Sequence, residues 1–534
     1  MRKLIISEKN HAAMRIATIL SEGKARRRNL HGVQAFEFER PDGIYSVIGL
    51  RGHLVALDYP KKYNDWNGIQ IKDLINVEPV KSVEPSSSRI LSALKRLEAD
   101  ADEIIIATDY DREGELIGVE TLEELNWKKK VSRVRFSALT KGEILDAFKN
   151  PAEVDFKLAS AAETRQIIDL KWGAALTRFL SVTTGQTGRD FLSVGRVQSP
   201  TLTLIVDRER EIESFVPHKF WEIVADLTEG DKDEPVFHAT HSNGKFDDKE
   251  KAHAIVEKLR HAKTGTVREF SSETRSDYPP HPFNTTQFLA EASKLGLSAA
   301  QAMRIAEDLY TDGYISYPRT DNTVYPQSLS LRQILRNLDN TEFSEYAKEI
   351  LAQETLRPSR GRTTTTDHPP IYPTSGAKKG ELRGNHWIIY ELVCRRFLAT
   401  LYPSAVYQEK HADILITDEK FDAAGRHLID PGWRKVYIYW KFEEKWLPDL
   451  AKDEPVNVKH IRLKEGETKP PARYTQGMLI QEMERKGLGT KSTRHEIIQK
   501  LYDRKFVHSS RMRPTPTGSA VIVALENHAR EVTD

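Results

Sequence analysis

Residues 103–115 read EIIIATDYDREGE and join a short apolar run to a dense acidic turn. The run at 103–108 has the length and composition of a strand buried on both faces, and the residues after it predict a helix. The same order occurs earlier, where KLIIS at 3–7 precedes an amphipathic helix that ends near Gly23. Strands that alternate with helices are typical of a parallel, doubly wound sheet. We therefore predict a domain of this kind over residues 1–150.

Beyond residue 150 the apolar pattern predicts helical and strand-rich regions in turn. The helical regions are 151–215, 281–403 and 471–534, and the strand-rich regions are 216–280 and 404–470. One strand-rich unit is therefore interrupted by an inserted helical block. Its second part includes WRKVYIYW at 433–440, whose alternation predicts a strand. The predicted fold class is a multidomain protein that combines an α/β part, α-helical parts and a β-rich part.

The composition limits the class of protein. Of the 534 residues, 39% are hydrophobic and 30% are charged, which favours a folded globular protein over a membrane or disordered one. The charged start, MRKLIISEKNHAA, has no apolar stretch of the kind found in signal peptides, so we expect no secretion and a cytoplasmic location. The single cysteine, Cys394, excludes a disulfide within the chain and a cysteine-rich zinc site. The net charge of +2 does not by itself indicate a nucleic acid partner.

The acidic turn places Asp109, Asp111 and Glu113 at alternate positions. Alternate residues of an extended segment face the same side, so these carboxylates would repel one another unless a cation lies among them. Oxygen ligands in this number suit Mg²⁺. A solvated acidic turn that caps a helix explains the turn by itself equally well. The first strand, however, ends in Glu8 and Lys9, and an acid and a base beside a metal are suited to phosphoryl transfer.

A tyrosine gives a second signal, in LSAAQAMRIAEDLYTDGYISYPRTDN at 297–322. The stretch predicts a helix that ends at Gly313, followed by an extended piece. Because Pro318 follows Tyr317, we expect Tyr317 to be extended, with its side chain on the same side as that of Arg319. An arginine can stabilise the phenolate of a tyrosine, whose ordinary pKa is near ~10, and can also bind phosphate. Taken alone, the segment is better explained by an ordinary half-buried aromatic residue.

Five motifs together resemble the type IA DNA topoisomerases, in the family's order and over nearly the whole chain. IISEK and ATDYDREGE resemble the two halves of the Toprim signature, and FLSVGRVQSPTLTLIVDREREI at 191–212 resembles the DNA-groove segment. The nucleophile region follows, from PFNTTQFLAEASKLGLS to GYISYPRTDN. The last two motifs are DHPPIYPT at 367–374 and RYTQGMLIQEMERKGLGTKSTRHEIIQKLYDRKFV at 473–507.

Two details are similar to the archaeal topoisomerase I and topoisomerase III-like branch: Lys9 directly follows Glu8, and a proline follows the tyrosine. The resemblance implies a toroidal ring of four domains. They are a Toprim domain with a Rossmann-like parallel sheet (domain I, 1–150), a β-rich hinge domain (II, 216–280 and 404–470), a helical domain that carries the tyrosine (III, 281–403) and a helical DNA-groove domain (IV, 151–215 and 471–534). Many members continue into a zinc-binding or basic tail, which this sequence lacks, so we interpret it as a catalytic core.

The resemblance also implies residue roles. Tyr317 would attack a phosphodiester of single-stranded DNA, keep the 5′ phosphate and release a 3′ hydroxyl. Lys9 would protonate the leaving oxygen with help from Glu8, while Arg319 would stabilise the phosphate and His368 would orient it. The implied Mg²⁺ ligands are Asp109, Asp111 and Glu113, with Glu8 shared. The implied DNA-binding residues are His53, Arg112, Arg165, Asp169, Ser193, Val194, Gly195, Arg196, Val197, Gln198 and Arg504.

The implied activity is ATP-independent relaxation of negative supercoils, decatenation, or both. We expect the active site at an interface between two domains, with Tyr317 buried against Glu8, Lys9 and Asp111. The resemblance further implies a monomer associated with the nucleoid, with no membrane contact, and it allows a helicase partner. Two alternatives stay open: a Toprim-type nuclease or primase, which would not need Tyr317, and a non-catalytic single-stranded DNA-binding protein.

Overall fold

The amino-terminal part of the chain folds around a six-stranded sheet in the order β2-β3-β4-β1-β7-β8. The computed structural model describes residues 1–66, 68–188, 191–230 and 234–533. The strands of the sheet are β1 (Arg2–Ser7), β2 (Arg26–Leu30), β3 (Val33–Arg40), β4 (Gly43–Gly49), β7 (Glu103–Ala107) and β8 (Lys130–Arg133). Strands β4, β1, β7 and β8 run parallel, which confirms the predicted sheet, and β2 and β3 add an antiparallel edge.

Helices cover both faces of this sheet. They are α1 (Asn10–Leu20) and α5 (Lys141–Lys149) on one face, and α3 (Ser88–Glu98) and α4 (Arg112–Glu124) on the other. Alternate residues of β1 explain the two layers, because Ile5 packs in the core with α1 whereas Leu4 and Ile6 pack in the core with α3 and α4. Since β1 and β7 are parallel neighbours, their carboxyl ends bring Glu8 and the acidic turn to one edge.

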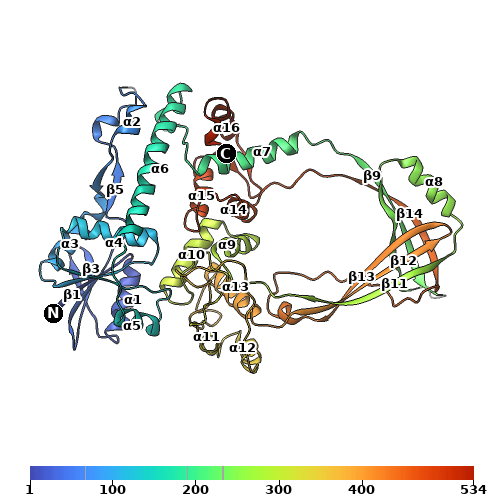
Figure 1. The fold of residues 1–534 in the computed structure, drawn as a ribbon, viewed down its shortest axis with the longest axis horizontal. Coiled ribbons are helices and arrows are strands. Elements are labelled where there is room, and N and C mark those ends of the chain that lie inside the picture. The colour runs from blue at the N-terminus through green and yellow to red at the C-terminus, as the bar shows by residue number, and fades with distance from the viewer. Residues whose placement is uncertain (67, 189–190, 231–233, 534) are drawn as a thin grey trace.

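A long helix connects the sheet to the carboxy-terminal helices. The members of this region are α6 (Phe156–Thr183), α7 (Gln198–Glu213), α14 (Gln476–Arg485), α15 (Arg494–Asp503), α16 (Pro516–His528), η5 (Arg530–Val532) and the ribbon of β15 (Val507–His508) and β16 (Arg513–Pro514). A hairpin of β5 (Val55–Asp58) and β6 (Val80–Val83), with η1 (Lys61–Tyr63), α2 (Asp73–Asn76) and η2 (Pro85–Ser87), extends from the sheet along α6 (Figure 1). Segments that are far apart in the sequence therefore pack together, since α7 contacts α15 and α16.

The strand-rich segments close into a barrel in the order β10-β13-β12-β11-β14-β9. Its strands are β9 (Lys219–Glu229), β10 (Phe237–Phe246), β11 (Thr264–Asp277), β12 (Ala405–Ile416), β13 (Glu419–Asp430) and β14 (Pro455–Glu467), and α8 (Lys249–Leu259) packs beside them. Leu227, Phe237, Ile414 and Phe421 are buried in its core. Because the barrel is closed, each of its described strands pairs with a neighbour on both sides, and Ala252 and Leu259 of α8 complete its core.

A helical block lies between β11 and β12, as the sequence predicted. It contains α9 (Thr285–Lys294), α10 (Ala299–Thr311), α11 (Leu331–Asn337), α12 (Ser344–Leu351) and α13 (Asn385–Ala399). The strand predicted at 433–440 is wrong, because the segment forms the short helix η4 (Gly432–Lys435) and then turns. Its buried residues are Trp433, Val436 and Tyr437, which is helical rather than alternating spacing.

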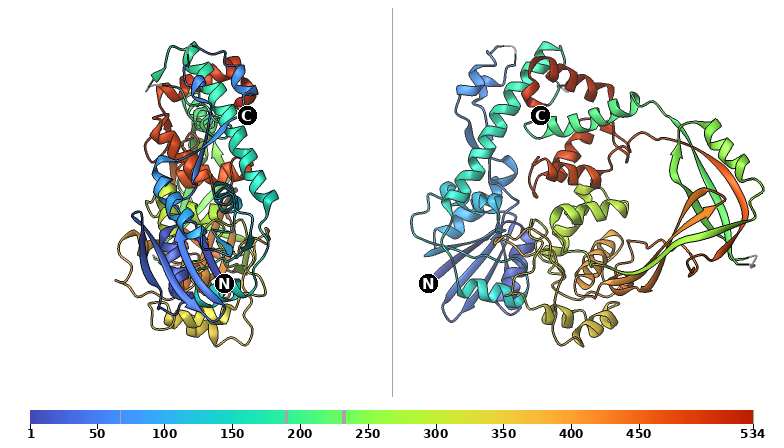
Figure 2. Two further views of the ribbon diagram at one scale, coloured as in Figure 1. Left: turned by 90° about the vertical axis from the view of Figure 1, so that its left-hand side faces the viewer. Right: turned by 45° about the vertical axis from the view of Figure 1, so that its right-hand side comes forward.

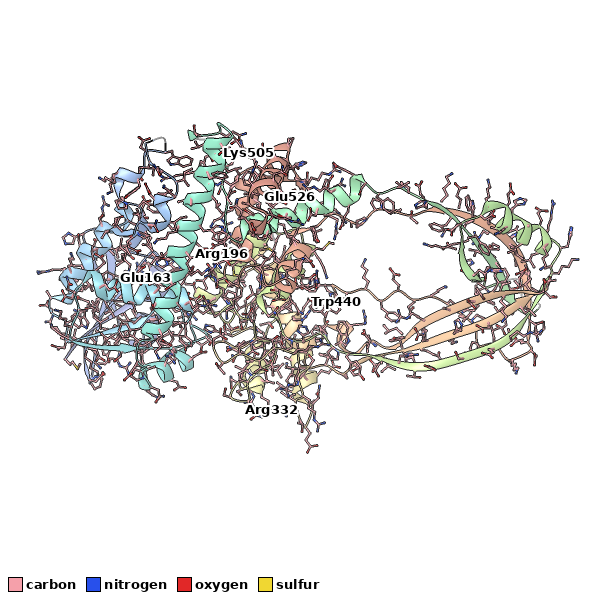
Figure 3. The ribbon with its side chains drawn as sticks, turned by 45° about the horizontal axis from the view of Figure 1, so that its top comes forward. Glu163, Arg196, Arg332, Trp440, Lys505 and Glu526 are labelled. Carbon is pink, nitrogen blue, oxygen red and sulfur yellow. The ribbon has the colours of Figure 1, made fainter. Side chains whose placement is uncertain are left out.

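The whole chain forms a ring. Long strands leave the helices, reach the barrel and return, so that the ribbon encloses an opening between the barrel and helices α7, α9 and α13 (Figure 1). The opening remains when side chains are drawn (Figure 3), and the molecule is narrow when seen from the sheet's side (Figure 2). Among the described residues, no helix is both long and apolar enough to span a membrane. The sheet and the inserted helices meet on the side opposite the barrel.

Candidate active site

Tyr317 lies at the contact between the inserted helices and the sheet. It follows α10, which Ser298 caps: the Oγ of Ser298 accepts from the backbone N of Gln301 at 3.2 Å. Gly313, with φ +75°, comes directly after this helix and its cap. The backbone N of Tyr317 donates to the carbonyl of Ser137 at 2.8 Å. Its side chain is only 3% exposed, and its hydroxyl donates to Oδ2 of Asp111 at 2.6 Å. Two motifs that are 206 positions apart in the sequence therefore share one hydrogen bond.

The acidic turn is held in place from two sides. Asp111 caps α4, since its Oδ1 accepts from the backbone N of Gly114 at 2.8 Å. Gly114 permits this turn, because a Cβ at this position would lie 2.0 Å from the carbonyl oxygen of Asp109. Arg133 of β8 is fully buried, pairs with Glu115 at 2.8 Å and donates to the carbonyls of Thr108 and Asp109, each at 2.8 Å. The turn is thus fixed by groups that are not themselves part of the site.

Two residues of α10 face the acidic turn. The hydroxyl of Tyr310 donates to Oδ1 of Asp109 at 3.0 Å. Glu307, one turn earlier, accepts from Nζ of Lys9 at 3.1 Å and from Nη2 of Arg319 at 2.6 Å. Neither Tyr310 nor Glu307 was predicted from the sequence as a site residue. The available signal was their spacing of three, which places both on one helix face directly before the tyrosine.

Arg319 lies among carboxylates. Besides its bond to Glu307, its Nη1 is 3.5 Å from Oε2 of Glu113 and 4.0 Å from Oδ2 of Asp111. Its Nε is buried and has no hydrogen-bond partner. Tyr317 and Arg319 therefore both reach Asp111, in agreement with the expected common direction of their side chains.

The ring of His368 is hydrogen-bonded to residues of the sheet domain through both of its nitrogens. Its Nε2 is 2.7 Å from the carbonyl of Tyr110, its Nδ1 is 2.8 Å from Oγ of Ser137, and its ring centre is 4.6 Å from that of Tyr317. Burial lowers the pKa of His368 to about 4, so the ring is neutral and carries one N–H. That N–H donates to the Tyr110 carbonyl, and Nδ1 accepts from Ser137. Both nitrogens are occupied here, so in this conformation the ring is not free to orient a phosphate.

A groove of about 940 Å³ leads away from the acidic turn between α6, α15 and the loop at 364–367. The predicted residues that line it are Asp111, Arg112, Glu113, Arg165, Asp169, Val194, Gly195, Arg196, Val197 and Gln198. Arg196 lies beside α6 (Figure 3) and pairs with Asp169 at 2.9 Å. The groove also includes Lys491, Thr493, Arg494 and Lys500, which the sequence analysis did not identify. They belong to the last motif, where the basic character of Lys491, Arg494 and Lys500 was the available signal.

Three predicted DNA-binding residues do not line this groove. His53 pairs with Glu120 at 2.8 Å on the sheet domain. The carbonyl of Ser193 accepts from Nε2 of Gln198 at 3.2 Å, which positions that side chain. Arg504 lies over the ring of Phe191 at 4.5 Å. These residues were assigned by position in a motif, and a motif does not determine which side chains of a loop or helix face the groove.

Comparisons with known proteins concern the family and the fold of the chain. The sequence matches the Toprim domain over residues 3–139 and the DNA topoisomerase family over residues 153–534. The chain belongs to the type IA DNA topoisomerases. It is 49% identical to DNA topoisomerase 1 of Archaeoglobus fulgidus, across 100% of this chain and 78% of the relative, and 31% identical to DNA topoisomerase 3 of Caenorhabditis elegans, across 95% and 69%. The structure is similar to full-length topoisomerase I from Thermotoga maritima, with a TM-score of 0.78, 29% identity, and coverage of 99% of this chain and 84% of that one.

The acidic residues of this type IA topoisomerase are suited to a divalent cation. Burial raises the pKa of Glu8 well above its usual value, and the charges of Asp109 and Asp111 raise it further. Burial and the charge of Asp111 also raise the pKa of Asp109 to about 6. This crowding of negative charge would be relieved by a bound cation, and the donors are all oxygen atoms, as Mg²⁺ prefers.

The carboxylates are spread too widely to enclose a metal ion by themselves. Within the described chain, the only three candidate ligands whose atoms all lie within 4.8 Å of one another are His411, Asp413 and Asp422, on the barrel. No three of Glu8, Asp109, Asp111 and Glu113 meet that distance. Because Mg²⁺ usually keeps several of its waters and takes one or two carboxylates, the residues of the acidic turn still fit this ion.

Proposed function

We propose that Tyr317 of this topoisomerase cuts one strand of single-stranded DNA through a 5′-phosphotyrosyl intermediate. The observation that supports this most directly is the 2.6 Å contact between the Tyr317 hydroxyl and Asp111 at a domain interface. The phenolic oxygen forms a bond to phosphorus and loses its proton to Asp111, while the bond from phosphorus to the 3′ oxygen breaks. Lys9 donates a proton to that oxygen, with Glu8 as a neighbouring proton source, and Arg319 stabilises the charge on the phosphate. Religation reverses these steps.

Mg²⁺ is the cofactor that the acidic turn supports. Asp109, Asp111 and Glu113 would hold the ion, with Glu8 as a further ligand. When bound, it would neutralise these carboxylates and help to keep the cut strand in place for religation. The covalent intermediate conserves the energy of the phosphodiester bond, so the reaction needs no ATP.

The ring supports a strand-passage reaction. We assign residues 1–150 to the Toprim domain, 281–403 to the domain that carries Tyr317, 216–280 with 404–470 to the hinge, and 151–215 with 471–534 to the groove domain. The groove, lined by Arg165, Arg196 and Lys491, would hold one DNA strand with little sequence preference. Movement of the Tyr317 domain away from the Toprim domain would open the ring for a second strand. Relaxation of negatively supercoiled DNA and decatenation both follow from this movement.

A plasmid assay tests the proposal. With Mg²⁺ and no ATP, the wild-type chain should relax negatively supercoiled plasmid, and detergent should trap an adduct on the 5′ end of the cut strand. Tyr317→Phe should abolish both, because no other group supplies the nucleophile. Tyr314→Phe is the matched control, since Tyr314 lies in the same segment but packs against Tyr390. Cleavage by Tyr317→Phe would instead support a Toprim-type nuclease.

A further inference from the structure

Glu307 binds two cations that come from different parts of the molecule. One carboxylate oxygen accepts from Lys9, at the end of β1, and the other accepts from Arg319, beyond α10, at 3.1 and 2.6 Å. The Glu307 side chain is 19% exposed and that of Arg319 is 15% exposed, so solvent screens the interaction of their charges only weakly. Hydrogen bonds between charged groups in such surroundings are among the stronger ones in proteins.

The same two cations have a different partner in the proposed reaction. Lys9 and Arg319 are the groups that would contact the scissile phosphodiester, which carries one negative charge and two nonbridging oxygens. The Glu307 carboxylate also carries one negative charge and two oxygens, and it uses one oxygen for each cation. The buried Nε of Arg319 has no acceptor, so the guanidinium keeps a donor free for a further oxygen. Glu307 thus matches the phosphodiester in charge and in number of acceptors.

We infer that Glu307 is a positioning residue that takes the place of the DNA phosphate while the site is empty, and that the phosphate must displace it. This inference rests on the proposed function, because that function assigns Lys9 and Arg319 to the phosphate. Glu307 then has two effects. It keeps the two cations in place in the absence of DNA, and it competes with the DNA backbone for them.

A simpler reading makes Glu307 a structural link between the Toprim domain and the helical block. The two readings differ in their dependence on salt. A phosphate that displaces Glu307 leaves a free carboxylate, which gathers a cation from solution, so fewer ions are released on binding. A structural link alone would not change the number of ions released by DNA.

The experiment measures binding of a short single-stranded oligonucleotide at several salt concentrations, with a chelator present and in the Tyr317→Phe background so that no cleavage occurs. Glu307→Gln keeps the shape of the side chain and removes its charge. We expect Glu307→Gln to bind DNA about three- to tenfold more tightly at low salt. The slope of log binding constant against log salt concentration should become steeper by about 0.7 to 1. Asp308→Asn is the matched control, because Asp308 is adjacent on α10, is 55% exposed and contacts His386 instead. It should leave the salt dependence unchanged.

The inference is overturned if Glu307→Gln has the same salt dependence as Asp308→Asn, or if it binds DNA more weakly while circular dichroism shows an intact fold. Glu307→Ala serves as a second variant, and it should show the same steeper salt dependence as Glu307→Gln. If the parent chain itself does not bind the oligonucleotide, the proposed function fails. If the parent chain binds the oligonucleotide and the Glu307 variants do not differ from it, the inference alone fails.

Discussion

Tyr317 is protonated at neutral pH in this conformation. Burial raises the pKa of its phenol well above the usual value, the charge of Asp111 raises it further, and the nearby Arg319 lowers it only in part. The proposed nucleophile is therefore a neutral phenol in this conformation, and it must lose its proton when it forms the bond to phosphorus.

Asp111→Asn separates the two tasks of this carboxylate. The amide oxygen can still accept from the backbone N of Gly114, and the amide nitrogen, in the place of Oδ2, can donate to the Tyr317 oxygen, so the fold should be retained, but the negative charge is lost. We expect plasmid relaxation to fall at least about tenfold, since the proposed metal site loses a ligand, and oligonucleotide cleavage to fall less. Both activities are measured on one preparation with Mg²⁺. Equal losses would contradict the metal assignment.

Asp109 makes stability depend on pH in the absence of metal. Its pKa is about 6 in the folded chain, against about 3.9 in an unfolded chain. Between about pH 4 and pH 6 the folded state keeps a proton that the unfolded state has already lost, so stability decreases as the pH rises through this window and levels off above pH 6. Asp109→Asn should therefore raise the Tm at pH 7.5 with a chelator present, and the gain should shrink at pH 5. Asp100→Asn, at an exposed carboxylate, should show no such trend. A pH-independent gain would contradict this explanation.

At the scale of elements, the active site depends on the loop between β7 and α4. Arg133 on the neighbouring strand β8 binds this loop through two carbonyl groups and pairs with Glu115 of α4, with both side chains fully buried. One arginine thus fixes the strand, the turn and the helix that carry the acidic residues. Such a pair is favourable only when both members are present, because a lone buried charge is costly.

Arg133→Met should destabilise the Toprim domain by about 3–5 kcal/mol, because Glu115 would remain buried without its partner. The free energy of unfolding is measured by urea denaturation. Arg135→Met is the control, since Arg135 is exposed and lies over the Tyr110 ring, and it should change stability by less than about 1 kcal/mol. A second substitution, Glu115→Leu, should recover part of the loss. No recovery would indicate that Arg133 acts mainly through its backbone contacts.

At the scale of the molecule, the contact between the Toprim domain and the helical block is rich in polar groups. Beside the Lys9–Glu307 pair, it includes the hydrogen bonds from Tyr317 to Asp111 and from Tyr310 to Asp109, and the contact of His368 with Ser137. Polar groups can form hydrogen bonds with water once the interface opens. The free energy needed to separate such an interface is therefore lower than that needed to separate an apolar core. The barrel, whose strands are closed into one unit, has no such seam and is suited to remain intact while the ring opens.

Ser137→Ala should favour the open ring. It removes the hydroxyl that donates to His368, a neutral hydrogen bond worth about 1 kcal/mol, so the open-to-closed ratio should rise up to about fivefold. Energy transfer between dyes at Lys24→Cys and Lys348→Cys reports the distance, and Cys394 does not interfere because it is buried. Ser92→Ala, on α3 and remote from the interface, is the control. An unchanged ratio would show that this bond does not hold the ring closed.

The sequence by itself determined the local features of this protein. The parallel sheet and the helical insertion follow from apolar periodicity, which acts between residues a few positions apart. Pro318 likewise predicts an extended Tyr317 from its immediate neighbour. The position of the acidic turn was also predictable, because β1 and β7 are parallel strands whose carboxyl ends lie at one edge of the sheet. The strand at 433–440 failed because alternation within a short segment does not distinguish a strand from a turn whose buried residues are Trp433, Val436 and Tyr437.

Only the tertiary structure decided which partners these residues meet. Glu307 and Lys9 are 298 positions apart, and His368 and Tyr110 are 258 apart, so no local pattern connects them. Arg133 was equally inconspicuous, because an arginine on a strand is ordinarily exposed and its burial depends on Glu115 across the layer. Hydrogen bonds and ion pairs form only between groups that the fold brings within a few ångström of each other. Their pairing is therefore fixed by how the sheet, the helical block and the groove helices pack together.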